Sequence, residues 1–419
     1  MALFSKILLN DVIWDTLKLI SYRVGTDRPW GLTKMHLYNQ KWKLKKRINP
    51  KQDTRFYFDE DQTGLSENHP DINFKGNIVV FKNGLLGSGG YGNVYRAAIN
   101  QADGTVIPVA LKIAKRKVKL DRPSASFIHE LLVYWDNSSN PECSPHMLCV
   151  LGAFFVQLTD CDPDEYYECI VFERMDGDLD DLADAAASLN LSVDSKMHLL
   201  AYMMLHMTYD VYTMHVYGYI HIDIKPTNFL YKYDADKGVY RIKISDMGMA
   251  CTFDQTKLDR IRQKAEATKN TLMDITPLFR YTIDLGCNPG GTLWYMSPDM
   301  KDLYLKDTSN KALDDTYKQL ALDNDIYALA MSCDSLQRNL QISSTDLLKY
   351  ANTAVLNMRN GDFMSAIAAE NYFVRNKIPL PVVTTPAPED RKIKDPYSPN
   401  PYDLTLSDIT VNPPSAMQI

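Results

Sequence analysis

The stretch IHIDIKPTNFL, residues 220–230, sets three chemically different polar side chains between apolar residues. These are the carboxylate of Asp223, the amine of Lys225 and the carboxamide of Asn228. Pro226 lacks a backbone N–H and disfavours helical geometry in the residue before it, so a continuous helix is excluded. The three groups are therefore expected on a loop between apolar anchors, close enough to act together.

A further carboxylate follows at the end of a short apolar strand. In IKISDMGMA, residues 242–250, apolar and polar residues alternate and then give way to Asp246 and a glycine. Such a carboxylate is suited to hold the metal ion that bridges nucleotide phosphates, and the Asn228 carboxamide could share that ion. Asp223 could then orient a hydroxyl and accept its proton, while Lys225 neutralises charge on a transferred phosphoryl group.

A glycine-rich segment lies upstream, LLGSGGYGNV at residues 85–94. Gly87, Gly89 and Gly92 have G-x-G-x-x-G spacing, which fits a dinucleotide-binding turn, a hairpin over phosphates or a merely flexible hairpin. The residues that follow, NVYRAAI, predict a second strand rather than the helix that a dinucleotide-binding fold needs. Glycines let backbone N–H groups approach phosphate oxygens, so the pattern favours a nucleoside triphosphate under a β-hairpin.

The next predicted strand carries VALK, residues 109–112, and directs Lys112 toward the interior. A buried lysine needs a partner, because an isolated buried ammonium costs several kcal/mol. Glu130 lies on a helix expected over about 124–135 and could pair with Lys112, which would hold the amine toward phosphates. The alternative is a surface lysine and an unrelated surface glutamate.

Taken in order, these motifs resemble the eukaryotic-type protein kinase family: Gly-rich loop, V-A-x-K, helix glutamate, H-x-D-x-K-x-x-N, D-x-G and a segment similar to A-P-E. The resemblance covers about residues 79–335. It implies a bilobal α+β fold, with an antiparallel β N-lobe that carries one main helix and a mostly α-helical C-lobe. The expected divisions are an N-terminal extension of unknown role (1–78), the N-lobe (79–173), the C-lobe (174–377) with a long activation segment (246–299), and a Pro-rich, disordered tail (378–419).

The resemblance also implies roles for individual residues. Lys112 would bind the α- and β-phosphates of ATP and Glu130 would pair with it, while Asp223 would be the catalytic base, assisted by Lys225. The expected Mg²⁺ ligands are Asn228 and Asp246. The other expected nucleotide contacts are Gly87, Ser88, Gly89 and Gly92 over the phosphates, Glu173 and Met175 in the adenine-binding hinge after the gatekeeper Phe172, Asp178 near the ribose, and Val94, Ala110 and Leu230 around adenine. For residues 172–178, an ordinary strand followed by a turn is the alternative.

The acceptor side resembles the family as well. GTLWYMSPDM, residues 291–300, is similar to the substrate-docking loop, and Lys225 with Thr292 resembles the serine/threonine-specific pattern. Asp325 in DNDIYALAM resembles the helix aspartate that braces the catalytic loop. The implied activity is therefore transfer of the γ-phosphate of ATP to protein Ser/Thr hydroxyls, with Mg²⁺. A pseudokinase scaffold that binds nucleotide without turnover is the first alternative, and a kinase for small-molecule hydroxyls, which would lack the docking loop, is the second.

Several positions depart from the family pattern. Ile222 stands where regulated kinases carry arginine, so activation by phosphorylation of the activation segment is not expected. Met247 replaces the customary phenylalanine, and Asp299 replaces the glutamate that reaches a C-lobe arginine. The activation segment, residues 246–299, contains a charged, helix-compatible stretch that is either a solvated insertion or a docking element. The short C-lobe would fit a divergent or virus-encoded member.

The composition bounds these interpretations. The 419 residues suffice for two lobes, because single cores stop growing at roughly 250–300 residues. A formal charge of −6 gives no global attraction to nucleic acid. The seven cysteines form no C-x-x-C pair and are expected to be reduced thiols. Without a signal peptide or a run of roughly 20 apolar residues, the chain is expected to be soluble and intracellular, in the cytoplasm or nucleus.

Overall fold

The computed structural model describes only part of the chain. The described residues are 36–44, 54–57, 77–100, 106–119, 124–137, 144–158, 165–254, 256–257, 259, 287–306, 317–342, 373–383, 393–394 and 403–404. The charged middle of the activation segment and most of the predicted tail lie outside them.

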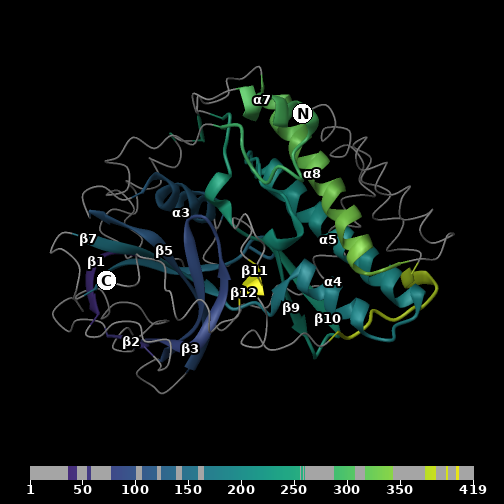
Figure 1. Ribbon diagram of the computed structural model, residues 1–419, viewed down its shortest axis with the longest axis horizontal. Helices are drawn as coiled ribbons and strands as arrows, with labels where there is room; N and C mark the ends of the chain where they lie inside the picture. The colour runs from purple at the N-terminus through teal and green to yellow at the C-terminus, as the bar shows by residue number, and fades with distance from the viewer. Residues whose placement is uncertain are drawn as a thin grey trace.

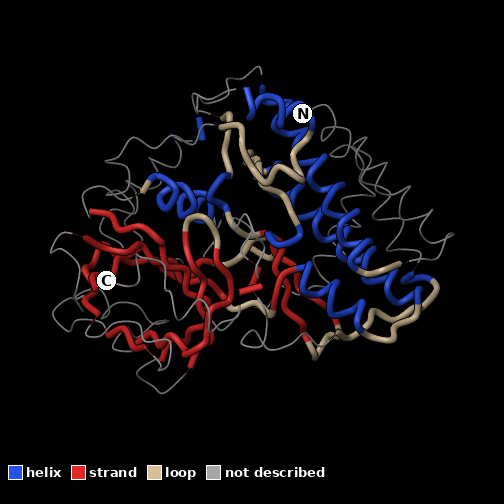
Figure 2. Tube along the Cα trace, viewed as in Figure 1, coloured by secondary structure: helices blue, strands red, loops and turns tan. Residues whose placement is uncertain are grey.

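A seven-stranded sheet forms the N-lobe, and Figures 1 and 2 show its strands gathered on one side of the molecule. The strand order is β1-β6-β7-β5-β4-β3-β2, and every neighbouring pair is antiparallel except β1 and β6. The strands are β1 (His36–Leu44), β2 (Thr54–Tyr57), β3 (Asn77–Ser88), β4 (Gly92–Asn100), β5 (Val106–Lys119), β6 (Val150–Leu158) and β7 (Glu165–Glu173). The predicted antiparallel N-lobe is therefore confirmed.

The N-terminal extension contributes the two outer strands of this sheet. β1 pairs with β6 at one edge, and β2 pairs with β3 at the other. An unpaired edge exposes backbone N–H and C=O groups that can recruit another chain. Two strands that precede the glycine-rich loop thus cover both edges of the sheet formed by β3 to β7.

In the described part of the N-lobe, the helix α3 (Ala125–Asn137) accompanies the sheet, as the sequence predicts. Its start is fastened to β7, because the Glu168 carboxylate accepts hydrogen bonds from the Ser124 N–H, at 2.5 Å, and from the Ser124 hydroxyl. On the other side α3 packs against the short 3-10 turn η4 (Met247–Met249), which belongs to the C-lobe. The helix therefore links the sheet to the activation segment.

Helices dominate the C-lobe, opposite the sheet in Figure 2. They are α4 (Leu179–Ser188), α5 (Val193–Val216), α7 (Pro298–Lys306) and α8 (Lys318–Asn339), with the 3-10 turn η3 (Pro226–Asn228) and a small sheet of β8 (Gly177–Asp178), β9 (Phe229–Asp234) and β10 (Val239–Ile244). Most of α5 is buried, 17 of its 24 residues, in agreement with the predicted buried helix, and Gly218 follows it with φ +81°. Among the described residues, no helix is both long and apolar enough to cross a membrane.

The C-terminal part of the chain departs from expectation. The prediction places a disordered tail from residue 378, whereas residues 378–383 pack on the C-lobe. The Tyr240 hydroxyl donates to the Pro381 carbonyl at 2.9 Å and accepts from the Val383 N–H at 2.8 Å. Proline prevents a helix here, but one tyrosine hydroxyl and a row of apolar side chains suffice to hold extended backbone. Further on, β11 (Ile393–Lys394) pairs with β12 (Asp403–Leu404).

The expectation of reduced thiols is wrong for part of the chain. Cys251 and Cys287 form a disulfide, with their Cα atoms 5.0 Å apart and 36 positions between them in sequence. Cys149 is also disulfide-bonded, while Cys169 and Cys333 are free and buried. Sequence spacing could not reveal the Cys251–Cys287 pair. The two cysteines are far apart in the chain, and only folding brings them together beside the start of the catalytic loop.

Candidate active site

The glycine-rich loop is a hairpin between β3 and β4. The Gly89 N–H donates to the Gly92 carbonyl at 2.9 Å, and the Ser88 hydroxyl donates to the Asn93 carboxamide oxygen at 2.8 Å. A Cβ on Gly92 would lie 2.9 Å from a carbonyl oxygen of β5, so close packing requires glycine there. Around Gly87, by contrast, no described atom would crowd a Cβ, and a bound phosphate is the group that could require glycine.

A charged cluster joins β5, α3 and the segment after β10. Lys112 Nζ donates to both carboxylate oxygens of Glu130, at 2.9 and 2.8 Å, and to Oδ1 of Asp246 at 3.4 Å. Burial alone would lower the pKa of Lys112, but the carboxylates of Glu130 and Asp246 outweigh burial and raise it. Lys112 is therefore a fixed cation, held by the partner that the sequence indicates.

Asp246 carries an ionised carboxylate beside Lys112. Its side chain is 47% exposed, in contrast to the buried Glu130. Desolvation alone would raise the pKa of Asp246, but the positive charges of Lys112 and Lys225 outweigh it and lower the pKa. The carboxylate is thus charged and accessible at neutral pH.

Asn228 is joined through its backbone to the residue before Asp246. The N–H of Ser245, the residue before Asp246, donates to the Asn228 carbonyl at 2.7 Å. The Asn228 carboxamide nitrogen donates to the Asp223 carbonyl at 2.8 Å, so the carboxamide oxygen lies on the opposite side of the amide. A carboxylate and a fixed amide oxygen are hard oxygen donors, which Mg²⁺ prefers. The residues present therefore fit a Mg²⁺ ion.

A second cluster forms around Asp223 in the catalytic loop. Lys225 Nζ donates to Asp223 Oδ2 at 2.6 Å and to the Thr292 hydroxyl at 3.0 Å. The Thr292 hydroxyl and N–H both donate to Asp223 Oδ1, each at 2.7 Å. Asp223 is only 8% exposed, so its two oxygens are oriented by near neighbours rather than by solvent.

Asp325 on α8 holds the backbone of this loop through hydrogen bonds, as the sequence predicts. Its Oδ2 accepts from the His221 N–H at 2.7 Å and from His215 Nε2 at 2.9 Å, and its Oδ1 accepts from the Ile222 N–H at 2.8 Å. Ile222 has φ +70°, a left-handed conformation that β-branched residues rarely adopt. The buried carboxylate holds the backbone in this conformation, immediately before Asp223.

Gly291 is a site residue that the sequence analysis missed. Its φ is +109°, and a Cβ added there would lie 2.7 Å from the Ile222 carbonyl oxygen. Only glycine allows this approach, which brings the next residue, Thr292, onto Asp223. The adjacent glycines at 290 and 291 were the available signal.

The predicted hinge residues Glu173 and Met175 both lie in buried surroundings, and their contact with adenine stays a prediction. The Glu173 carboxylate is buried and accepts from Lys243 Nζ at 2.6 Å and from the Cys149 N–H at 2.8 Å. This buried ion pair ties β7 of the N-lobe to β10 of the C-lobe, and the Glu173 N–H donates to the Cys149 carbonyl at 3.0 Å. Met175 is buried in the core of the C-lobe side. The signal for Lys243 was a lysine between two isoleucines in an apolar strand.

Asp178, predicted near the ribose, caps α4. Its carboxylate accepts from the Asp181 N–H at 2.9 Å, and the Asp181 carboxylate accepts from the Asp178 N–H at 3.3 Å. Val94 on β4 and Leu230 on β9 are half-buried on facing lobes, while Ala110 on β5 is buried. Their contacts with adenine stay a prediction.

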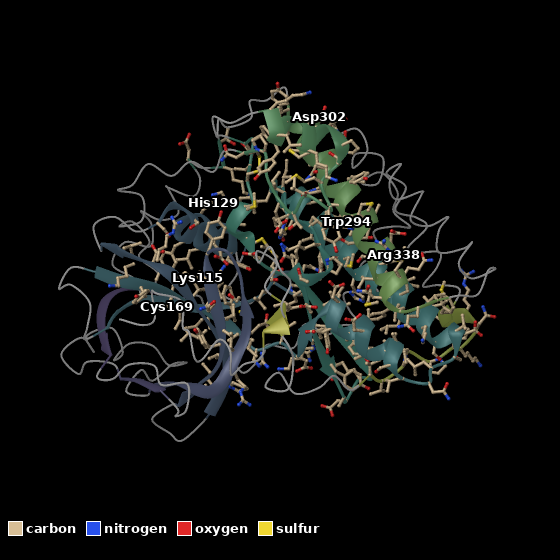
Figure 3. All side chains as sticks on the ribbon, in the orientation of Figure 1. Lys115, His129, Cys169, Trp294, Asp302 and Arg338 are labelled. Atoms are coloured by element: carbon tan, nitrogen blue, oxygen red, sulfur yellow. A yellow bond between two sulfur atoms is a disulfide. The ribbon has the colours of Figure 1, made fainter. Side chains whose placement is uncertain are left out.

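The docking loop is anchored differently from the family pattern. The Ser297 N–H donates to the Asn324 carboxamide oxygen at 3.0 Å, and Pro298 begins α7. Asp299 is exposed, so the anchor here is Ser297 rather than the acidic residue. Trp294 in this loop is 61% exposed, and Figure 3 places it on the C-lobe side, whereas His129 and Cys169 lie on the N-lobe side.

Comparison with known proteins agrees with this geometry. A family model described as "Protein kinase domain" matches residues 81–314, more than half of the chain. No curated protein matches the chain. The matched range begins in β3, before the glycine-rich loop, and contains the whole of both polar clusters, from Lys112 to Thr292. The chain belongs to the protein kinase family.

Proposed function

We propose that this chain transfers the γ-phosphoryl group of ATP to serine and threonine hydroxyls of proteins. The observation that supports this acceptor class is the cluster of Asp223, Lys225 and Thr292, in which one lysine binds both other side chains. The lysine and the threonine stand in the pattern typical of serine/threonine-specific kinases.

The reaction would proceed by in-line displacement. The acceptor oxygen forms a bond to the γ-phosphorus while the bond from that phosphorus to the β,γ-bridging oxygen breaks, and ADP leaves. Asp223 would orient the acceptor hydroxyl and take its proton, and Lys225 would stabilise negative charge on the transferred group. Lys112 would position the α- and β-phosphates under the glycine-rich hairpin. When bound, Mg²⁺ neutralises charge on the phosphate oxygens, and Asn228 and Asp246 would hold it.

A polypeptide acceptor is supported by the surface beside this cluster. Leu293 and Trp294 follow Thr292 directly and are 49% and 61% exposed. Large apolar side chains at an exposed position offer anchoring area to a partner chain. A small-molecule acceptor would have no need of such a surface next to the catalytic base.

The test is phosphate transfer from γ-labelled Mg-ATP onto a generic basic protein and onto the chain itself. Wild type should yield phosphoserine or phosphothreonine, and Asp223→Asn should yield none while still binding nucleotide. Asp236→Asn, in the exposed β9–β10 turn, makes the same chemical change away from the site and should behave as wild type. Phosphotyrosine would refute the acceptor class, and nucleotide binding without transfer by wild type would favour the pseudokinase.

A further inference from the structure

Tyr134 lies on α3 one turn after Glu130, on the same face of the helix. Its hydroxyl oxygen accepts a hydrogen bond from the backbone N–H of Asp246 at 3.1 Å. The side chain is 4% exposed, and its ring meets the ring of Phe172 edge-on, with 5.6 Å between the ring centroids. One helix of the N-lobe therefore reaches the charged cluster twice, through Glu130 to Lys112 and through Tyr134 to Asp246.

The backbone of Asp246 is in an uncommon conformation. Asp246 has φ +60° and ψ +66°, in the left-handed region that few non-glycine residues adopt, aspartate more often than most. It lies two positions beyond the end of β10, so the ladder of that sheet does not extend to its N–H. The direction of the Asp246 carboxylate depends on this backbone conformation, and that carboxylate faces Lys112.

The Tyr134 hydroxyl is a neutral acceptor suited to this role. Burial raises the pKa of Tyr134 well above its usual value, although the hydrogen bond from the Asp246 N–H lowers it. A buried backbone N–H without an acceptor would be costly, and the Tyr134 oxygen supplies that acceptor. Met247 stands where the family usually has phenylalanine, and here the aromatic ring at this junction comes from α3.

We propose that Tyr134 is a positioning residue for Mg-nucleotide binding: its hydroxyl fixes the backbone of Asp246, which directs the Asp246 carboxylate toward the metal of the bound nucleotide. This role rests on the proposed function, because it concerns the same nucleotide site. The contact is specific to this chain, because it comes from the hydroxyl of a tyrosine side chain on α3.

The test is a Mg²⁺ titration of binding of a fluorescent ADP analogue to Tyr134→Phe. This change removes one oxygen and keeps the ring against Phe172. The Mg²⁺ concentration for half-maximal enhancement of ADP binding should rise about three- to tenfold, as expected for one lost hydrogen bond, while ADP affinity without Mg²⁺ stays the same. In an Asp246→Asn background, the same change should shift the titration by less than about twofold, because the hydroxyl acts through that carboxylate.

The matched control is Tyr240→Phe, which removes another buried hydroxyl that accepts from a backbone N–H, away from the cluster. It should lower the melting temperature and leave the Mg²⁺ titration unchanged. A Tyr134→Phe titration equal to wild type would overturn the proposal, and so would equal weakening with and without Mg²⁺, which would indicate loosened packing. If wild type binds Mg-ADP but transfers no phosphate, the proposed function fails, and the titration still decides the role of Tyr134. If the ADP affinity of wild type does not depend on Mg²⁺, the positioning role of Tyr134 is also overturned.

Discussion

The two sides of the phosphotransfer centre are held in place by different means. On the nucleotide side, Lys112, Glu130 and Asp246 come from three elements, and charge holds them together across the lobes. On the acceptor side, the one ion pair described, Lys225 with Asp223, lies within a single loop. Asp325 behind the loop and a bridge of paired backbone between Ile220 and Cys251 hold that loop in place.

The acceptor side has further supports that do not depend on charge. The Cys251–Cys287 disulfide joins the two ends of the long activation-segment insertion, and both sulfur-bearing residues lie in an apolar cluster with Ile220, Ile222 and Met296. Ile222, in place of the usual arginine, is part of this cluster. The comparison teaches that apolar packing and a disulfide support the acceptor side, whereas charged groups from both lobes hold the nucleotide side together.

The largest effect is expected from Lys112→Met, which removes the cation at the centre of the nucleotide side. The change leaves the buried Glu130 carboxylate without its cation and removes the charge that faces the phosphates. Loss of one preorganised electrostatic group typically costs on the order of 10²–10³ in rate, so kcat/KM should fall by about that factor. Steady-state kinetics on wild type, Lys112→Met and the exposed-site control Lys306→Met would measure it. Unchanged kinetics in Lys112→Met would contradict the view that charge holds the nucleotide side together.

Loss of the disulfide should loosen the acceptor side. A disulfide that closes a loop of several tens of residues typically contributes about 2–4 kcal/mol to stability, mainly by restricting the unfolded chain. The Cys251→Ala/Cys287→Ala variant should therefore unfold at lower denaturant concentration than wild type. Reductant, which also opens the disulfide at Cys149, should lower the stability of wild type at least as far as that of the variant. Cys333→Ala, at a buried free thiol, controls for the loss of a sulfur. A variant as stable as wild type would mean that the apolar cluster alone holds the segment.

A smaller effect is expected at Thr292, where the acceptor side meets the chemistry. Thr292→Val keeps the shape and removes the hydroxyl that contacts both Lys225 and Asp223. Hydrogen bonds to charged groups are worth about 1.5–3 kcal/mol, so kcat should fall roughly 10- to 100-fold. KM for ATP should not change, because the nucleotide side is untouched, and Thr292→Ser should restore most of the rate. An increase in KM for ATP of similar size would show that the two sides are not independent.

The sequence predicted the charged groups better than their surroundings. Each of these charged residues lies within or at the end of an apolar element, where it needs a partner: Lys112, Glu130, Asp223 and Asp246. Their order in the chain suggests which residues pair. Residue type and order were therefore enough to predict the charged groups. The same reasoning found the brace at Asp325, because its position on the helix follows from the family pattern.

The missed contacts depend on how distant segments meet. Tyr134 is an aromatic residue at helical spacing, which reads as ordinary core, and only the folded chain shows its hydroxyl at the Asp246 N–H. Glu173 and Lys243 are 70 positions apart, and neither neighbourhood indicates the other. Cys251 and Cys287 lack any ligand or disulfide spacing. Such pairs are set by tertiary packing, which periodicity and motif order do not encode.

The smallest predicted effect is a pH dependence of stability at the start of α3, where Glu168 anchors the helix on the nucleotide side. Burial raises the pKa of Glu168 to about 7, although the Ser124 hydroxyl and N–H lower it. The folded state therefore binds a proton that the unfolded state has already lost, so this group's contribution to stability is complete at low pH and is lost as pH rises through about 7.

Glu168→Gln should remove this dependence. Its amide oxygen can accept from the Ser124 N–H and its amide nitrogen can donate to the Ser124 hydroxyl, so α3 keeps its anchor in a neutral form. Relative to the variant, wild type should lose on the order of 2 kcal/mol of stability between about pH 5 and about pH 7. Urea unfolding across this range measures the difference, with Asp236→Asn as the exposed control. Parallel pH profiles for wild type and Glu168→Gln would show that the start of α3 is not pH-sensitive, and the nucleotide side would then depend on the charged cluster alone.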